Sequence, residues 1–385
     1  MPRGQAGRLR VGLVCPYSLD APGGVQNHVL GLAHFLAGQG HQPRVLAPGA
    51  LSADALRPLD PGRFTSAGSA VSVRYNGSVA RVNFGPLTAA RVRRWLRTGR
   101  FDLLHIHEPV TPSIALLALW AAEQPVVATF HAATPRSRSL RLAGTMLRSA
   151  VDKLDARIAV SETARDVVRR HLGTDATVVP NGIHFADYAR PSPPLLPGRR
   201  RPRLLFLGRT DEPRKGLDVL LAALPAIRRA EPDLEVVIVG EGQHPLPAGC
   251  RRVGRVSEAE KVALLSTADV FIAPQRARES FGIVLVEAMA SGVPVVASDL
   301  IPFVDLLGPA GPGTAAAGTV FRAGDPAALA QAVIEELRRP DPARTRRARR
   351  RAWRYDWSAV GAEIEQVYRT VLTAGPAATD RQRAG

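Results

Sequence analysis

The segment covering residues 269–298 restricts the fold of this chain more than any other. Residues 269–272 form an apolar run that predicts a strand, and residues 293–297 predict a second one. Between them, residues 281–290 carry a broad apolar stripe that predicts a helix, and Gly292 closes it just past the last turn. Strand, helix and strand in this order predict a β–α unit of a parallel sheet.

Two glutamates mark this segment as a candidate binding site. Glu279 precedes the predicted helix, and Glu287 lies about two turns further on, inside it. The backbone N–H groups of residues 280–283 lack partners within a helix and favour an anion. A nucleotide-sugar presents phosphates to such donors and hydroxyls to such carboxylates. The plainer alternative is a helix-start carboxylate and a solvated Glu287, but apolar Val286 and Ala288 make that position costly for an unpartnered carboxylate.

Residues 187–202 are rich in proline and arginine, and similar β–α patterns lie on both sides of them. Because the strand and helix patterns begin again after residue 202, these residues are predicted to form a linker. We therefore expect two Rossmann-like α/β domains with parallel sheets. The expected parts are an N-terminal domain (1–186), a linker (187–202), a C-terminal domain (203–355), a terminal helix that packs back on the N-terminal domain (356–373) and a disordered tail (374–385).

The composition narrows the class of protein. A formal net charge of +17 favours anionic partners such as nucleic acid, an anionic membrane or phosphorylated substrates, but no nucleic-acid recognition motif accompanies it. Cys15 and Cys250 give no disulfide framework or zinc spacing. The longest apolar run, residues 114–122, is shorter than the roughly 20 residues that cross a bilayer, and the first ten residues lack the apolar core of a signal peptide. We expect a cytoplasmic protein, soluble or peripheral to the membrane.

A predicted helix at residues 88–98 gathers part of the positive charge. It carries Arg91, Arg93 and Arg94 next to Trp95. Basic side chains near an anionic leaflet contribute about 1 kcal/mol each, and tryptophan suits the headgroup level. The pattern thus fits attachment to a membrane surface as well as a solvated helix whose arginines serve solubility.

Three loops that follow predicted strands carry further candidates. Gly24 ends a glycine-rich turn between a strand and a helix, and His131 stands at the carboxyl end of a strand. Arg209 and Lys215 share the first strand-to-helix loop after the linker. Ligands of open α/β sheets bind beyond the carboxyl ends of the strands. Taken singly, each feature also has a structural explanation: a turn, a loop histidine, and a basic loop in a basic protein.

Seven segments together resemble the retaining glycosyltransferases of family four, and within them the actinobacterial phosphatidylinositol mannosyltransferases. The segments are CPYSLDAPGGVQ, YNGSVAR, HIHEP, VATFH, GRTDEPRKG, ESFGIVLVEAMASG and RYDWS, and the resemblance runs from Val11 to about Tyr368. It implies the GT-B fold, in which two Rossmann-like parallel-sheet domains face each other across a cleft. The donor then binds the C-terminal domain and the acceptor the N-terminal one.

The resemblance also implies roles for individual residues. Arg209 and Lys215 hold the donor diphosphate, Glu279 contacts the sugar hydroxyls, and His131 faces the sugar from the other domain; these four are the catalytic candidates. Glu287 holds the nucleotide ribose. The remaining donor-binding candidates are Gly24, Val256, Lys261 (near the base), Ser280, Phe281, Gly282 and Ile283. The acceptor candidates are Tyr17, Gln26, Asn76, Arg81 and Arg136, and the membrane candidates are Arg91, Arg93, Arg94 and Trp95.

The implied reaction moves mannose from GDP-mannose to the inositol ring of phosphatidylinositol, with retention, at the inner face of the cell membrane. It is an early step of phosphatidylinositol mannoside synthesis. No tightly bound cofactor is expected, and without a D-x-D motif the sequence does not require a metal for the diphosphate. Alternatives are another nucleotide-sugar donor, another acceptor (a lipid, an inositol phosphate or a polysaccharide end), and, from a different class, a nucleotide-sugar epimerase. Residues 275–278 replace a glycine-rich approach to Glu279, and Arg136 stands where the family suggests lysine.

Overall fold

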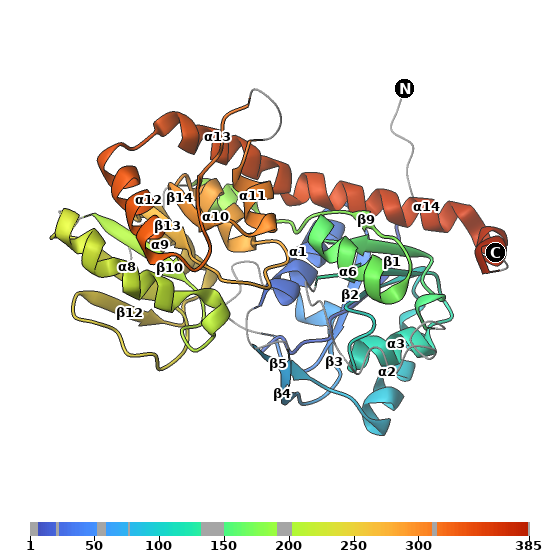
Figure 1. Cartoon of the computed structure of the whole chain (residues 1–385). Coiled ribbons are helices and arrows are strands. Elements are labelled where there is room, and N and C mark those ends of the chain that lie inside the picture. Colours follow the sequence, from blue (N-terminus) through green and yellow to red (C-terminus); the bar gives the residue numbers. More distant parts are fainter. Residues whose placement is uncertain are drawn as a thin grey trace. The chain divides into compact units, whose positions relative to one another are not determined.

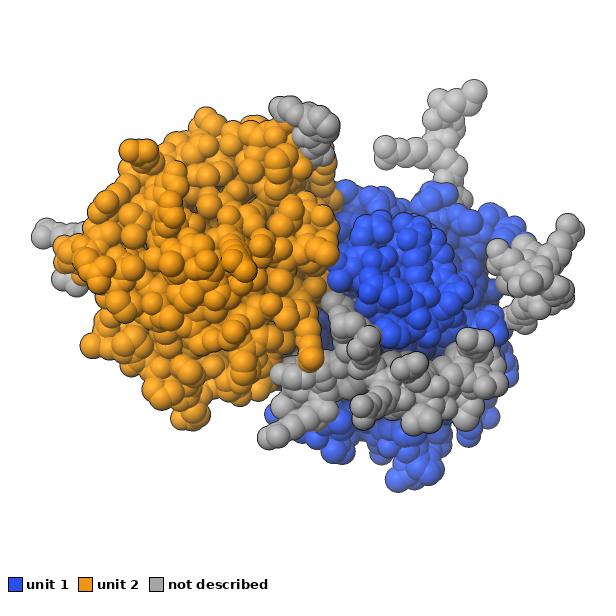
Figure 2. All heavy atoms as spheres, in the orientation of Figure 1, with its two compact units in different colours: residues 1–182, 357–385 blue, residues 183–356 orange. Residues whose placement is uncertain are grey.

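The computed structural model describes residues 7–20, 23–51, 59–75, 78–131, 150–190, 202–309 and 314–383. Two compact units are present, coloured separately in Figure 2. Unit 1 contains residues 1–182 and 357–385, and unit 2 contains residues 183–356. Each unit is built on one parallel sheet, which confirms the predicted α/β class.

The described part of unit 1 forms a seven-stranded parallel sheet of order β3-β2-β1-β6-β7-β8-β9. Strands β1, β2, β3 and β9 of this sheet are labelled in Figure 1. Its strands are β1 (Arg10–Val14), β2 (Gln42–Ala47), β3 (Phe64–Ser66), β6 (Leu103–His107), β7 (Val126–Phe130), β8 (Ala156–Ala159) and β9 (Thr177–Val178). Every residue of β6 and β7 is buried, as expected where helices cover both faces of a parallel sheet. A separate antiparallel hairpin joins β4 (Val71–Tyr75) to β5 (Ser78–Val82).

The helices of unit 1 supply the rest of its core. Among the described residues they are α1 (Gly24–Gly38), α2 (Pro86–Gly99), α3 (Ile114–Ala121), α6 (Glu162–Leu172) and α14 (Trp357–Arg383). Although α14 is the last element of the chain, Trp357, Ile364 and Tyr368 pack into the same apolar cluster as Val11 of β1 and Leu32 of α1. The C-terminal helix is therefore part of unit 1.

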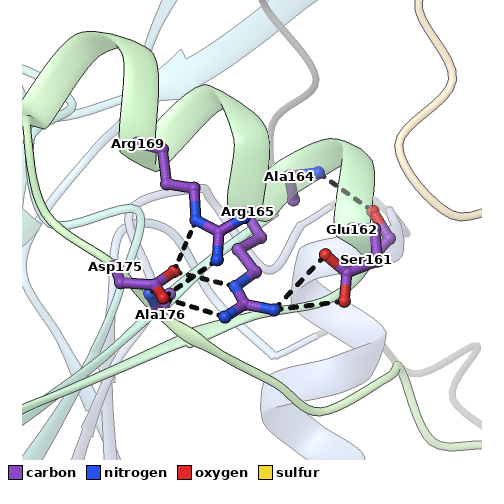
Figure 3. A network of polar contacts seen from close by, with 7 residues as sticks. All are labelled: Ser161, Glu162, Ala164, Arg165, Arg169, Asp175 and Ala176. Carbon is purple, nitrogen blue, oxygen red and sulfur yellow. Dashed lines mark hydrogen bonds and ion pairs between the residues drawn. The ribbon is translucent and has the colours of Figure 1, made fainter.

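Polar contacts fix the start of α6 and the loop that follows it (Figure 3). The hydroxyl of Ser161 accepts a hydrogen bond from the backbone N–H of Ala164, which satisfies a free donor at the helix start. Asp175, beyond the helix, accepts hydrogen bonds from Arg165 and Arg169 at 2.8–3.0 Å. These two guanidinium groups hold the pKa of Asp175 below its usual range.

The described part of unit 2 forms a six-stranded parallel sheet of order β12-β11-β10-β13-β14-β15. Its strands are β10 (Arg203–Leu207), β11 (Glu235–Val239), β12 (Cys250–Gly254), β13 (Val270–Ala273), β14 (Val295–Ser298) and β15 (Thr319–Phe321). Its α-helices are α7 (Phe185–Ala189), α8 (Leu217–Ala230), α9 (Glu258–Ser266), α10 (Ile283–Ser291), α11 (Ile301–Leu307), α12 (Pro326–Arg338) and α13 (Pro342–Ala352). The segment β13–α10–β14 is the predicted strand, helix and strand.

In both sheets the strand order reverses beside the first strand of the unit. In unit 1, β1 has β2 on one side and β6 on the other; in unit 2, β10 has β11 and β13 as neighbours. Connections leave such a pair of strands in opposite directions, so a crevice opens at their carboxyl ends. The loops after β1, β6, β10 and β13 are therefore the places to look for ligand-binding residues.

Several predicted boundaries differ from the structure. The units divide between Gly182 and Ile183, because residues expected at the end of the N-terminal domain and in the linker form α7 of unit 2; residues 191–201 of the predicted linker lie outside the described ones. The tail predicted to be disordered continues α14 as far as Arg383. Helix α10 begins at Ile283 instead of residue 281, because Gly282 has a φ of 91° and stands outside the helix.

Candidate active site

The loops after β10 and β13 bring three predicted catalytic residues of unit 2 into one network of charges. Lys215 Nζ lies 3.1 Å from Glu279 Oε2. Arg209 Nε lies 3.4 Å from Glu212 Oε1, and Arg214 Nη2 lies 2.8 Å from Glu212 Oε2. Since Arg214 also approaches Glu279 to 4.0 Å, the network connects Arg209 to Lys215 and Glu279 through residues that the sequence analysis did not single out.

Backbone packing explains why residues so far apart in sequence meet. Gly216 has a φ of 74°, and a Cβ at this position would lie 1.8 Å from the carbonyl oxygen of Pro274. Only glycine lets the two loops approach so closely. The N–H of Arg276 then donates to the carbonyl of Arg214 at 2.9 Å, so the Lys215 loop and the approach to Glu279 lie side by side.

The residue just before Glu279 has an unusual backbone conformation. Arg278 is exposed and has a φ of 57°, in the left-handed region that favours glycine. Arg278 belongs to residues 275–278, which stand where the family resemblance implies a glycine-rich approach to Glu279. The structure shows that the chain nevertheless adopts a glycine-like turn there, with an arginine in place.

Glu287 is the centre of a second, deeply buried cluster. Its carboxylate is only 4% exposed and lies 2.8 Å from Lys261 Nζ, which lies 2.8 Å from Glu258 as well. Burial raises the pKa of Glu287, while the positive charge of Lys261 works against this rise. One oxygen, Oε2, has no hydrogen-bond partner among the described residues. A buried carboxylate oxygen without a donor is ready to accept a hydrogen bond from a ligand hydroxyl.

The other donor candidates lie around the starts of α9 and α10. Val256 is half-buried and precedes Ser257, which caps α9 with Glu260 in a capping box. Ser280 is half-buried, whereas the ring of Phe281 is buried against Tyr355. Phe281 can therefore offer a ligand only its backbone, together with Gly282 and Ile283 at the first turn of the nine-residue helix α10.

In unit 1, His131 follows β7 and is buried among other imidazoles. His107 Nδ1, at the end of β6, lies 3.0 Å from His131 Nε2. His28 of α1 meets both rings edge-on, with centroids 5.3 Å from His107 and 4.9 Å from His131. The backbone N–H of His131 donates to the carboxylate of Glu108, whose own N–H donates to the Thr129 carbonyl at 2.8 Å. These contacts join the carboxyl ends of β6 and β7.

Burial keeps these imidazoles neutral. Loss of water lowers the pKa of His28 to about 3 and places those of His107 and His131 well below 6.5, with the neighbouring imidazoles lowering the last two further. His105 behaves in the same way, with a pKa of about 3; its ring nitrogens bond to Tyr368 and Thr129, each at 2.6 Å. His28, His105 and His107 were not among the residues predicted from the sequence. The alternating H-I-H of β6 was the available signal, because it places two histidines on one face of the sheet.

Three acceptor candidates converge on Ser18, just beyond β1. Gln26 donates to the Ser18 carbonyl at 3.2 Å, and the Ser18 N–H donates to the carbonyl of Arg81 at 2.9 Å. Tyr17 is the preceding residue and is half-buried, while the Arg81 side chain is exposed. Gly24 is exposed at the start of α1. The two remaining acceptor candidates, Asn76 and Arg136, lie outside the described residues.

The membrane candidates divide between the two faces of α2. Arg91, Arg93 and Arg94 are exposed, although Arg91 also donates to the carbonyl of Ala67 at 3.1 Å. Trp95 is only 5% exposed and packs against Phe101, with centroids 4.4 Å apart. Its assignment to a membrane-facing set is therefore wrong, because the ring belongs to the core. None of the described helices is both long and apolar enough to cross a bilayer.

A pocket of about 180 Å³ lies at another place in unit 1. It is lined by Arg10, Gln42, Arg44, Thr98, Gly99, Arg100 and Phe101. Arg10 and Gln42 are the first residues of β1 and β2, so the pocket lies at the amino ends of the strands. No predicted site residue lines it, and the carboxyl-end loops remain the candidate site.

Comparison with known proteins decides the family. Residues 22–187 match the family "Glycosyltransferase Family 4", and residues 201–339 match "Glycosyl transferases group 1". The phosphatidyl-myo-inositol mannosyltransferase of Propionibacterium freudenreichii is 47% identical to this chain, over 94% of each protein. The enzyme of that name from Mycolicibacterium smegmatis is 46% identical over 95% of each. The chain belongs to glycosyltransferase family 4.

Membership of family 4 confirms the resemblance inferred from the seven segments, and the protein is a glycosyltransferase. The solved structure of Anabaena HepE, in complex with UDP and glucose, matches the fold with a TM-score of 0.69 at 17% identity, over 94% of this chain and all of that one. Two parallel-sheet α/β units are thus the GT-B fold of a family 4 enzyme. The epimerase alternative is not favoured.

Proposed function

We propose that this protein transfers mannose from GDP-mannose to the inositol ring of phosphatidylinositol, with retention of configuration, as an early step of phosphatidylinositol mannoside synthesis. The observation that carries the proposal is 46–47% identity over nearly the whole chain to two enzymes named phosphatidyl-myo-inositol mannosyltransferase. The matched region covers 94–95% of this chain and therefore extends through both units.

The geometry of unit 2 supports a nucleotide-sugar donor. Arg209 and Lys215 are cations that now lie against Glu212 and Glu279, at 3.4 Å and 3.1 Å. When the donor binds, its diphosphate takes the place of these carboxylates beside the cations, and Glu279 turns to the sugar hydroxyls. Glu287 Oε2 accepts a hydrogen bond from the ribose. As the bond between sugar and phosphate breaks, negative charge grows on the diphosphate, and the two cations stabilise it.

The acceptor is held by unit 1 in this proposal. Tyr17, Gln26 and Arg81, with Asn76 and Arg136, bind the inositol phosphate, and His131 contacts the sugar. No carboxylate is assigned as a nucleophile. The leaving phosphate takes the proton of the attacking inositol hydroxyl while the new bond forms on the same face of the sugar, which retains the anomeric configuration.

Attachment to the inner face of the cell membrane completes the proposal. Arg91, Arg93 and Arg94 supply the attraction to anionic headgroups, each contributing about 1 kcal/mol near the surface. With Trp95 in the core, the apolar contact comes from Leu87 in the first turn of α2, which is 78% exposed, and from Phe84 beside it, which is 51% exposed and lies 6.4 Å from the Trp120 ring.

A transfer assay with matched donors and acceptors tests the proposal. The enzyme is incubated with GDP-[14C]mannose and phosphatidylinositol vesicles, and label in the organic phase is counted. UDP-glucose, phosphatidylcholine vesicles and free inositol phosphate serve as controls. Label should appear only with GDP-mannose and phosphatidylinositol together. Equal transfer from UDP-glucose would contradict the donor assignment, and equal transfer to free inositol phosphate would contradict the lipid acceptor.

A further inference from the structure

The contact between His107 and His131 requires one ring to donate and the other to accept. The two nitrogens, His107 Nδ1 and His131 Nε2, are 3.0 Å apart, which is a hydrogen-bond distance. Both side chains are buried, and burial lowers both pKa values well below 6.5. Each ring is therefore neutral at pH 7 and carries one N–H and one bare nitrogen. The direction of the hydrogen bond fixes the tautomer of both rings.

The second nitrogen of His107 decides the direction. His107 is fully buried, and its Nε2 has no hydrogen-bond partner among the described residues. If His131 donated, the only proton of His107 would sit on this nitrogen as a buried, unpaired N–H. If His107 donates from Nδ1, Nε2 is a bare acceptor. Buried N–H groups without partners are rarer than under-satisfied acceptors, so the second arrangement is favoured.

We infer that His107 is a positioning residue that holds His131 in the tautomer with its proton on Nδ1. The surrounding contacts keep both rings in place. His105 stacks on His107 with centroids 4.4 Å apart and is itself held by Tyr368 of α14. Glu108, with a φ of 50°, accepts the backbone N–H of His131. The energetic cost of this left-handed residue fits a segment that is held for function.

The tautomer determines what His131 can do, and this consequence rests on the proposed function. The side chain of Asn181 also forms a hydrogen bond with His131. Because Nε2 accepts the proton of His107, the nitrogen that carries hydrogen and can donate to a substrate is Nδ1. His131 then donates a hydrogen bond to a sugar oxygen and has no free lone pair with which to act as a base. This agrees with a mechanism in which the leaving phosphate takes the acceptor proton.

A metal ion is the other occupant that three imidazoles suggest. Ring nitrogens of His28, His107 and His131 lie within 4.8 Å of one another. Tetrahedral zinc, with Zn–N bonds of 2.0–2.1 Å, spaces its ligand nitrogens about 3.4 Å apart. The 3.0 Å between His107 and His131 is shorter than this and matches a shared proton. A proton therefore explains this pair better than a metal does.

Nitrogen NMR of the imidazole rings tests the inference without any assay of activity. Protein labelled with 15N-histidine is studied at pH 7, and the His131 signals are assigned by their loss in His131→Asn. His131 should carry its proton on Nδ1. In His107→Leu, which cannot donate, the ring should shift toward the other tautomer. In His107→Asn, whose amide nitrogen can replace Nδ1 as donor, it should not. The exposed His244 in unit 2 supplies the control His244→Leu.

Three NMR results would overturn the inference: a proton on Nε2 of His131 in the wild type, an unchanged tautomer in His107→Leu, or signals that move when a chelator is added. Transfer assays form a separate arm. His107→Leu should lose about 10- to 100-fold in kcat with little change in the donor KM, and His107→Asn should recover most of it. If the wild type transferred no mannose, the proposed function would fail while the NMR result still decided the tautomer.

Discussion

The candidate site of unit 1 contains four buried imidazoles, which are at most 7% exposed and are all neutral. They belong to His28, His105, His107 and His131. The corresponding place in unit 2 holds a lysine between two carboxylates, with Lys261 at 2.8 Å from both Glu258 and Glu287. The first unit buries groups that share protons, and the second buries opposite charges. Neutral donors and acceptors suit an alcohol and a sugar, whereas paired charges suit a diphosphate and a ribose.

The two arrangements should fail in different ways. A buried neutral histidine destabilises the folded state at acid pH, because the unfolded chain binds the proton more tightly. A buried ion pair destabilises the folded state when one partner is removed, because the other charge is left without compensation. The folding stability of unit 1 should therefore depend on pH, and that of unit 2 should depend on keeping both members of its ion pairs. Four experiments test this contrast, in order of decreasing effect.

Removal of Lys261 should have the largest effect, which is a loss of folding stability of unit 2. Lys261→Met leaves Glu287 buried without a cation, which costs about 3–5 kcal/mol. Hydrogen exchange of the α10 amides, measured under conditions where exchange reports unfolding of unit 2, should show that loss. The double variant Lys261→Met/Glu287→Leu should recover most of it, because no charge is left uncompensated. If the double variant is as unstable as the single one, the loss comes from packing and the contrast between the units is weakened.

Removal of Lys215 should have the second largest effect, and it should lower the activity without lowering the stability. After the change, Glu279 still has the guanidinium of Arg214 at 4.0 Å, so its carboxylate is not left without a cation. Lys215→Ala should lower kcat about 10²- to 10³-fold by removing a cation from the growing charge of the diphosphate, with little change in thermal stability. Lys153→Ala in unit 1, a half-buried lysine that donates to the Trp120 carbonyl at 2.8 Å, is the matched control. Turnover near the wild-type value in Lys215→Ala would remove Lys215 from the catalytic set.

Acid should weaken unit 1 through its histidines. The folded-state pKa of His28 is about 3, below the ordinary 6.5. Between these values the unfolded chain binds the extra proton, so stability present above pH 6.5 is lost as pH falls toward 3. From pH 7 to pH 5, His28 and His105 should each cost about 2 kcal/mol. His28→Leu should reduce the loss of stability between pH 7 and pH 5 by about 2 kcal/mol, the contribution of one histidine.

Tryptophan fluorescence can follow unit 1 alone in this experiment. Trp353 is the only tryptophan in residues 183–356, so a Trp353→Phe background leaves reporters in unit 1 only. Urea unfolding of this background at pH 7 and pH 5 measures the change, and His244→Leu, an exposed histidine of unit 2, is the control. An equal pH dependence with and without His28 would show that this imidazole does not titrate on unfolding.

The sequence predicted what local pattern and position in a loop determine. Periodicity predicted β13, α10 and β14, and placement after a strand singled out Arg209, Lys215 and His131. It could not predict that Lys215 meets Glu279, because that contact depends on Gly216 lying against the carbonyl of Pro274, 58 residues further on.

The errors have the same origin. Trp95 was assigned to the membrane because it neighbours arginines in sequence, yet packing against Phe101 decides its place. His107 was left without a role because its partner His131 comes from the adjacent strand, and strand order is a tertiary property. The domain boundary was misplaced because α7, of only five residues, is too short to give a periodic signal.

The smallest effect compares two strained arginines, one in each unit. Arg100 (φ 48°) ends α2, and Arg278 (φ 57°) precedes Glu279. Both are exposed, and neither side chain makes a hydrogen bond or ion pair with a described residue. A left-handed residue other than glycine costs roughly 1–2 kcal/mol, and the greater freedom of glycine in the unfolded chain offsets up to about 1 kcal/mol of that.

Arg100→Gly and Arg278→Gly should each raise the unfolding free energy by about 1 kcal/mol or less, measured by urea unfolding. Only Arg278→Gly should change the donor KM, because only Arg278 adjoins a residue proposed to hold the sugar. If Arg278→Gly destabilises the protein while Arg100→Gly stabilises it, the arginine at 278 holds its loop through its side chain, and the turn before Glu279 depends on more than backbone strain.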